Sequence, residues 1–226
     1  MSSSLRRLAD RSLSSQAYDA IRDAILSLEL RPGEPLVEAK LADALGISKT
    51  PIRHALQRLE QSGLVVGAPN RGYFVSRLSV RDAEEILKIR SVLEGLAARE
   101  ACERLTDEAL AEMAELIRQA RAALADQDLE LCAELGHRFH QIIFDHANNA
   151  RLNGLIEVLN DQFHRIRLLS SRIPGRLPQS LQEHELVLEA LRARNAALAE
   201  ERMRSHLLMV LKDIERDELK IREPVH

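Results

Sequence analysis

The sequence has few aromatic residues and no long apolar run, and each shortage excludes a class of protein. Its 226 residues include no Trp, two Tyr and four Phe, whereas hydrophobic residues make up 45% of the chain. A chain that is poor in aromatic rings but rich in Leu, Ala, Arg and Glu is typical of a mainly α protein. No run of about 18 apolar residues occurs, so we expect no membrane-spanning helix and no membrane partner.

The low number of cysteines bears on the cellular compartment in which the protein is expected. Cys102 and Cys132 are the only cysteines, and two isolated thiols are not a disulfide framework. The first residues, "MSSSLRRLADRSL", lack the apolar segment of a secretory signal. We therefore expect a cytoplasmic protein with two buried, unreactive thiols.

The small net charge of −3 conceals an uneven distribution. Residues 1–78 carry 11 Lys and Arg against 8 Asp and Glu, whereas residues 79–226 carry 21 against 27. A basic N-terminal part on an acidic body indicates a polyanionic partner at the N-terminal end. It also fits a division into two domains, 1–78 and 79–226.

The N-terminal part has the outline of a helix-turn-helix. Apolar residues recur at helical spacing between residues 15 and 28, and the prolines of "RPGEP" end that helix. A short helix follows and ends at Gly46, a residue suited to a helix C-terminus. Ser48 is suited to cap a further helix over residues 49–61. Helix, tight turn with glycine and helix together form this motif.

The outward face of the second helix has the side chains that read DNA. An apolar stripe faces the core, which leaves polar and cationic residues on the opposite side. Arg suits guanine, Gln suits adenine and Thr suits either, while Lys49 and the positive helix end attract phosphate. The sequence therefore predicts insertion into the major groove of double-stranded DNA, although a merely solvated cationic face is the alternative. The predicted contacts from this helix are Ser48, Lys49, Thr50, Arg53, His54 and Gln57.

A predicted hairpin follows the helix-turn-helix. Residues 64–66 and 73–76 read as short strands, and the Gly/Pro/Asn-rich turn between them carries Arg71 and Gly72. A hairpin in this position is a wing, and Arg71 at its tip is placed to reach a minor groove or a phosphate.

The stretch "LRPGEPLVEAKLADALGISKTPIRHALQRLEQSGLVVGAPNRGYFV" resembles the N-terminal winged-helix domain of GntR-family bacterial transcription regulators. The resemblance covers about 60 residues and implies that Lys49, Thr50, Arg53, Arg71 and Gly72 contact the operator. Two positions depart from the family pattern. Lys49 stands where Arg is usual, which replaces a bidentate guanine contact by a point charge. His54 stands where Glu is usual, which removes a negative charge from the reading face.

Residues 79–226 predict an all-α bundle. A long helix covers most of "LSVRDAEEILKIRSVLEGLAARE", with Leu96 on its inward face, and turn signals separate the elements that follow. Six or seven helices are expected in total. Those after the first are predicted at about 106–125, 128–147, 149–170, 179–194 and 196–219.

Three histidines lie on the inward faces of three predicted helices. His140, His184 and His206 each have apolar neighbours at helical spacing. Imidazoles that converge from three helices are able to bind a divalent transition metal such as Zn²⁺, Ni²⁺ or Mn²⁺. The alternative is that each histidine is hydrogen-bonded separately in the core.

Arg90 lies on the apolar stripe of the first bundle helix, and a buried guanidinium needs an anion. Glu94, one turn further on, is one candidate partner, as an ion pair at i,i+4. The carboxylate of a bound effector is the other candidate.

The segments "GHRFHQIIFDHANNARL" and "QEHELVLEALRARNAALAEERMRSHL" resemble the FCD effector domain of the FadR subfamily of GntR regulators. The lack of a seventh helix favours the VanR-like branch. The resemblance implies a metal held by one Asp and three His, with His140, His184 and His206 as the histidines. Gly136 stands where the Asp is expected, so a water or effector oxygen takes that position or the metal is lost. His137 is a further candidate ligand.

These observations together predict a ligand-responsive transcription regulator, more often a repressor by family habit. A homodimer reads a palindromic operator, since one helix-turn-helix contacts only one half-site. A small organic acid in the C-terminal domain controls it. One rival is a metal-dependent hydrolase, because a metal held by histidines activates water. The other is a C-terminal domain that only dimerises.

Overall fold

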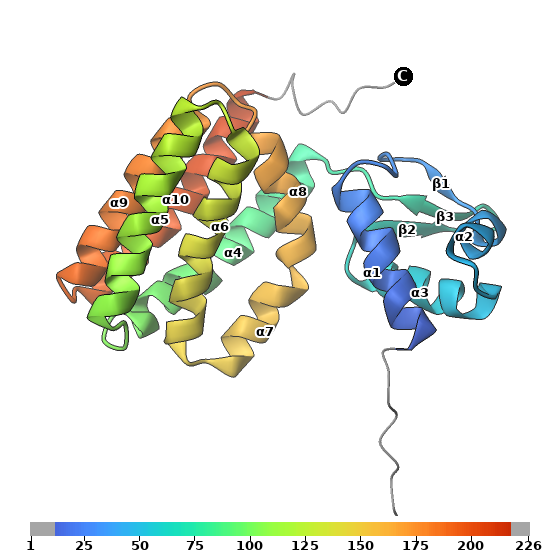
Figure 1. Cartoon of the computed structure of the whole chain (residues 1–226), viewed down its shortest axis with the longest axis horizontal. Helices are drawn as coiled ribbons and strands as arrows, with labels where there is room; N and C mark the ends of the chain where they lie inside the picture. The colour runs from blue at the N-terminus through green and yellow to red at the C-terminus, as the bar shows by residue number, and fades with distance from the viewer. Residues whose placement is uncertain (1–11, 218–226) are drawn as a thin grey trace, which may run out of the picture. The chain divides into compact units, whose positions relative to one another are not determined.

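The computed structural model describes residues 12–217, and the chain divides between Arg77 and Leu78 into two compact units. The N-terminal unit combines three helices with a small sheet, and the C-terminal unit is built from helices alone in its described residues (Figure 1). This architecture confirms the predicted mainly α fold with a winged helix-turn-helix and a helical bundle.

The N-terminal unit is a winged helix-turn-helix. Its strands form an antiparallel sheet in the order β1-β3-β2. The short strand β1 was not predicted; its Pro35 lies opposite Phe74 at a sheet edge, where a residue without an N–H is tolerated. The elements are α1 (Leu13–Leu26), β1 (Pro35–Leu36), α2 (Glu38–Leu45), α3 (Lys49–Gln61), β2 (Val65–Ala68) and β3 (Gly72–Val75).

The turn between α2 and α3 depends on Gly46. This residue ends α2 in the left-handed conformation, with φ of 66°, which glycine adopts at little cost. Ser48 takes the predicted N-cap position of α3 with an extended backbone. Its side chain makes no capping hydrogen bond, so Ser48 contributes to the cap through its backbone conformation alone.

The core of this unit fixes which face of α3 points outward. The apolar stripe of α3 is fully buried, and α1 packs against α3. Because one side of the helix is covered, its polar side is left exposed. The buried stripe consists of Ile52, Ala55, Leu56 and Leu59.

The C-terminal unit has seven helices in its described part. The predicted helix over 149–170 is interrupted at Leu159, where Val158 and Asn160 are both weak helix formers, so it becomes two. The lack of a seventh helix therefore no longer supports the VanR-like branch. The elements are α4 (Val80–Ala101), α5 (Asp107–Ala125), α6 (Leu129–Ala147), α7 (Ala150–Val158), α8 (Asn160–Ser170), α9 (Arg176–Arg192) and α10 (Ala196–Arg216).

Helix α4 is central to the bundle. A capping box starts it, in which Ser79 and Asp82 each accept from the other's backbone N–H. The helix packs against α6, α7, α8 and α10. Leu96 was expected to face inward but is 37% exposed, because the neighbours Gly95, Ala97 and Ala98 make the close contacts.

The structure also bears on the predictions for the two cysteines and for membrane-spanning helices. Cys102 and Cys132 are buried and unpaired, and burial raises the pKa of both thiols. Among residues 12–217, every helix is too short or too polar to cross a membrane.

Candidate nucleic-acid interface and metal centre

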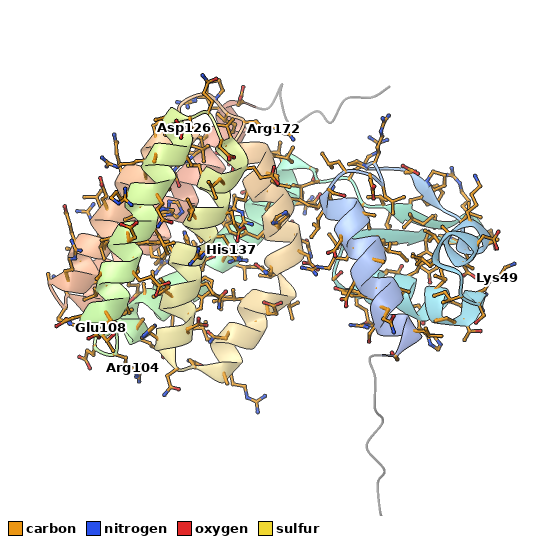
Figure 2. The ribbon with its side chains drawn as sticks, viewed as in Figure 1. Lys49, Arg104, Glu108, Asp126, His137 and Arg172 are labelled. Atoms are coloured by element: carbon orange, nitrogen blue, oxygen red, sulfur yellow. The ribbon has the colours of Figure 1, made fainter. Side chains whose placement is uncertain are left out.

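The outward face of α3 is polar and exposed. Thr50, Arg53, His54 and Gln57 are all solvent-accessible, as predicted from the periodicity. Lys49 lies at the start of α3, and its side chain points away from the unit (Figure 2). Ser48, directly before it, is also exposed. The fold thus brings the six predicted residues of this segment to one accessible helix end.

Arg53 has an ion-pair partner that the sequence did not predict. Its Nε and Nη2 lie 3.1 and 2.8 Å from the two carboxylate oxygens of Glu38, which opens α2. The hydrogen bond from Arg53 lowers the pKa of Glu38. The two residues are 15 positions apart, so helical periodicity within either element gives no sign of the pair.

The wing places Arg71 and Gly72 in the turn between β2 and β3. Gly72 has φ of 83°, which favours glycine, and both residues are exposed. The Arg71 guanidinium lies 5.5 Å from the centre of the Phe74 ring. This contact holds the cation on the hairpin while leaving its donors accessible.

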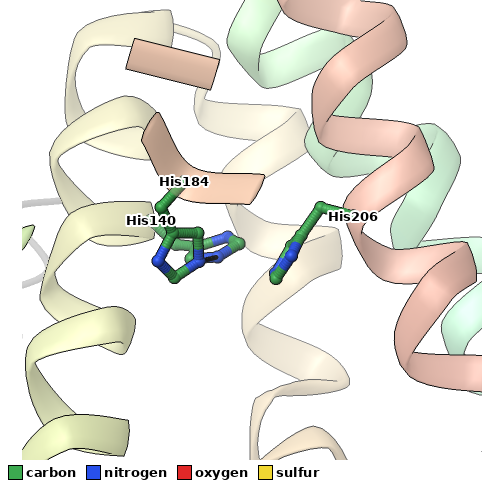
Figure 3. A group of neighbouring side chains, drawn as sticks. All are labelled: His140, His184 and His206. Carbon is green, nitrogen blue, oxygen red and sulfur yellow. Dashed lines mark hydrogen bonds between the residues drawn. The ribbon is translucent and has the colours of Figure 1, made fainter. Parts of the chain in front are cut away.

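In the C-terminal unit, the three predicted histidines come together. His140 of α6, His184 of α9 and His206 of α10 point toward one another (Figure 3). One ring nitrogen of each lies within 4.8 Å of the others, and the Nε2 atoms of His140 and His184 are 3.0 Å apart. Nitrogen ligands at about 2.0–2.1 Å from one metal ion lie roughly 3 Å from each other, so the spacing of His140 and His184 fits a shared divalent ion.

Two carboxylates, the buried Glu94 and the partly buried Glu183, contact the histidines of the cluster. Glu94 accepts from Nδ1 of His140 at 2.6 Å, and Glu183 accepts from Nδ1 of His206 at 2.7 Å. A carboxylate on one ring nitrogen fixes the tautomer and leaves the other nitrogen's lone pair for a metal. The set of donors therefore fits a transition metal and argues against three unrelated core histidines.

Burial sets the protonation states in this cluster. Burial lowers the pKa of His184 well below its usual value, and the neighbouring histidines lower it further. Burial also lowers the pKa of His206, although the hydrogen bond to Glu183 opposes the shift. Burial alone would raise the pKa of Glu94, but Arg90 and His140 together bring it down to about 2. His184 and His206 are thus favoured in the neutral form that binds metals.

Gly136 faces the cluster, as the resemblance implies for the missing Asp. A Cβ atom at this position would lie 3.3 Å from Cε1 of His184, and Gly136 lines the same cavity as the histidines. His137 of α6 (Figure 2) also lines the cavity but does not join the group of three. Burial, followed by the charge of Arg167, lowers the pKa of His137 to about 4.

Arg90 forms the ion pair with Glu94 that was one of its two predicted alternatives, and it also has a donor without a partner. Its Nε donates to Glu94 at 2.6 Å, and its guanidinium stacks on Phe163 at 3.9 Å. Its buried Nη1 has no hydrogen-bond partner within residues 12–217, and Nε of Arg167 is in the same state. Both arginines line the cavity, which has a free volume of about 60 Å³. Two unpartnered cationic donors in one cavity favour an anionic ligand.

Sequence reasoning missed Glu183, Arg167 and Arg176 in this site. Arg176 is buried, donates to Asp213 at 3.0 Å and also pairs with Glu183. All three lie on α8 or α9 and acquire their roles through contacts with other helices. The signal available in the sequence was a charged residue on an apolar helix face, the one that singled out Arg90.

Comparisons with known proteins find a family match for each of the two units. Residues 13–75 match the bacterial regulatory proteins of the gntR family, and residues 85–208 match the FCD domain, which covers more than half of the chain. The chain is a helix-turn-helix transcription regulator and not an enzyme. It belongs to the GntR family and carries a C-terminal FCD domain.

Individual relatives share nearly the whole length. The regulator YdhC of Bacillus subtilis is 30% identical over 193 residues, covering 84% of this chain and 86% of its own. McbR of Escherichia coli is 31% identical over 188 residues, covering 81% and 84%. The structure of E. coli McbR/YncC aligns with a TM-score of 0.71 at 29% identity, covering 93% of this chain and 98% of that one.

Proposed function

We propose that this protein is a cytoplasmic, ligand-responsive repressor that binds a palindromic operator as a homodimer. The single observation that carries the proposal is the exposed polar face of α3, held outward by a fully buried stripe. One relative, RspR of E. coli, which is 28% identical over 192 residues, is named a transcriptional repressor.

The proposed DNA contacts come from α3 and the wing. Arg53, Gln57 and Thr50 read base edges, while Lys49 and the helix N-terminus bind phosphate. Ser48 and His54 flank these contacts on the same exposed segment. Arg71 and Gly72 at the wing tip approach the minor groove or the adjoining backbone.

A second copy of the chain completes the operator-binding unit. One helix-turn-helix contacts a single half-site, and two-fold symmetry pairs it with a second. Helix α4 offers an apolar stripe for this contact, because Ile89, Val92 and Leu96 lie at helical spacing and are 51%, 52% and 37% exposed. Large apolar side chains grouped on one exposed face are typical of an interface.

His140, His184 and His206 hold a divalent transition metal in this proposal, with Glu94 and Glu183 orienting two of them. When bound, such an ion supplies a Lewis-acidic anchor for an oxygen ligand. Gly136 leaves the position of a carboxylate ligand open for a group brought by the effector.

The effector is a small organic acid. The cavity volume of about 60 Å³ accommodates on the order of five water molecules, at roughly 10–15 Å³ each, which suits an acid of a few carbon atoms. Arg90 and Arg167 offer the unpartnered donors for one carboxylate.

The charges around the cavity favour an acid with two carboxylates. Arg90 pairs with Glu94, Arg176 pairs with Glu183 and Asp213, and Arg167 lies 4.0 Å from the exposed Glu134. A divalent ion bound to the three histidines would add two positive charges to the cavity. No further acidic side chain of this cluster offsets them, because Gly136 stands where the resemblance implies an Asp. Binding of the acid then alters operator affinity, and this coupling is reciprocal.

Substitution of Arg53 tests the proposed function. Full-length protein is used to enrich duplexes from a randomised DNA pool, and its affinity for the enriched duplex is compared with that for a scrambled one. Arg53→Ala should lose at least tenfold in discrimination between the two, since a bidentate contact to a base is worth about 1–3 kcal/mol. Arg31→Ala, which removes an exposed positive charge outside α3 and the wing, should keep it. Equal discrimination by both variants would contradict the assignment.

A C-terminal unit that only dimerises is the remaining alternative. In that case neither the melting temperature nor operator affinity responds to small acids. The buried, unpartnered donors of Arg90 and Arg167 argue against it, because leaving them unpaired is costly. A melting-temperature screen of small mono- and dicarboxylic acids with metal-loaded protein separates the two cases.

A further inference from the structure

The ion pair between Glu38 and Arg53 uses one edge of the guanidinium and leaves another free. Glu38 binds the edge formed by Nε and Nη2, at 3.1 and 2.8 Å. Glu38 is the side-chain partner that the described residues give Arg53, and the adjacent edge, formed by Nη1 and the second hydrogen of Nη2, is left for another acceptor. A guanidinium has five N–H donors in a fixed plane, so holding one edge fixes the direction of the other.

We propose that Glu38 is a positioning residue that presents the free edge of Arg53 to a guanine in the operator. The inference rests on the proposed function, in which Arg53 reads a base. A guanine offers O6 and N7 in the major groove, and an arginine binds both atoms with two parallel hydrogen bonds. Because Glu38 has already oriented the guanidinium plane, less side-chain freedom is lost when this contact forms.

Electrostatics also favours a base contact over a phosphate contact. The Glu38 carboxylate lies directly against the Arg53 guanidinium and offsets much of its charge. A phosphate approaching Arg53 meets this carboxylate, whereas the neutral edge of guanine does not. Lys49, at the start of the same helix, forms no ion pair with Glu38 within the described part of the chain, so its ammonium group is the proposed phosphate ligand. With Glu38 in place, Arg53 is suited to contact a base, and Lys49 is suited to contact the phosphates of the DNA backbone.

A purely structural role for the pair is less consistent with the packing. Arg53 is 57% exposed in its side chain, and exposed ion pairs add little to stability. Helices α2 and α3 are already joined by apolar contacts, in which Ala42 of α2 and Ile52 of α3 belong to the same buried cluster. The bidentate geometry is therefore available for recognition without being needed to hold the helices together.

The test is a comparison of base preferences from a randomised duplex DNA pool, using full-length protein. Four proteins are compared: the parent, Glu38→Gln, Arg53→Ala and Asp43→Asn. Asp43 is an exposed acid on the same helix without a side-chain partner among the described residues, so its variant removes the same charge and leaves Arg53 untouched. Melting temperatures of all four confirm that each is folded.

We expect the parent and Asp43→Asn to demand guanine at one position of each half-site. Glu38→Gln and Arg53→Ala should both lose that preference at the same position and keep the others. Affinity of Glu38→Gln for the parent's enriched duplex should fall roughly tenfold, while its affinity for a scrambled duplex stays equal or rises. A structural clamp would not act on a single base position.

Other outcomes separate the possible failures. Full guanine preference in Glu38→Gln, with loss in Arg53→Ala, overturns the positioning role but keeps Arg53 as the reader. Full preference in Arg53→Ala overturns both. A parent protein that enriches no motif refutes the proposed function itself.

Discussion

At the scale of single residues, Gly136 stands where the resemblance to FCD domains implies an Asp. Its backbone faces His184, and the resemblance implies an acidic ligand there. Replacing it by Asp adds a carboxylate next to three imidazoles, so affinity for zinc or nickel should rise roughly tenfold or more. Affinity for a dicarboxylic acid should fall in the same variant, because the added carboxylate occupies the open position. Calorimetric titration measures both.

A matched control separates this effect from a general effect of Gly→Asp in a helix. Gly154 of α7 is exposed, and no atom lies within 4 Å of the place a Cβ would take. Gly154→Asp should leave metal and acid affinity unchanged. If Gly136→Asp behaves like Gly154→Asp, then Gly136 does not mark the vacated ligand position.

The residues of the proposed metal centre were predictable in part. Each of the three histidines stood on an apolar stripe of its own helix, which one sequence segment is enough to show. Glu183 was not recognisable, because its partner His206 lies 23 positions away on another helix. The same holds for Glu38, whose role depends on Arg53 in the next element. Local periodicity shows which face a residue occupies but not which side chain it meets there.

At the scale of elements, the turn between α2 and α3 sets the position of the reading helix. Gly46 has a left-handed backbone with open space around its missing side chain, so conformation alone opposes a substitution. Gly46→Ala should lower the free energy of unfolding of the N-terminal unit by about 1 kcal/mol. Gly154→Ala, in an ordinary helical position, should raise stability by about 0.5–1 kcal/mol. Chemical denaturation followed by circular dichroism measures both, and equal signs would contradict this reading of the turn.

Most elements followed from periodicity and turn residues, and the exceptions have physical causes. Strand β1 has only two residues, too few for an alternating pattern, and exists because β3 pairs with it. The break at Leu159 leaves the apolar spacing of the segment intact, so α7 and α8 read as one helix in the sequence. The first case depends on a strand that is distant in the chain, and the second on weak helix formers that the apolar pattern does not show.

At the scale of the whole molecule, the proposed recognition of a palindromic operator requires a dimer. Val92 is the central residue of the exposed stripe on α4, and a charge there would be buried without a partner in the proposed interface. Val92→Glu should therefore weaken self-association at least tenfold and reduce operator affinity with it. Sedimentation velocity and DNA titration measure the two effects.

Leu155→Glu is the matched control, since Leu155 is an exposed apolar residue on α7, outside the stripe. It should leave the association state unchanged. If Leu155→Glu dissociates the dimer and Val92→Glu does not, the interface lies on α7 and not on α4. The sequence alone does not distinguish the exposed apolar face of α4 from that of α7. The exposure of both faces becomes visible only when the packing of the helices is known.

A metal centre built from three histidines is the proposed ligand sensor of the C-terminal unit. The most direct test is elemental analysis of the native, untagged protein for transition metal per chain, together with His184→Ala. The account predicts about one equivalent in the parent protein and none in the variant. No bound metal in the parent, even after incubation with zinc or nickel, would contradict it, and the effector would then depend on Arg90 and Arg167 alone.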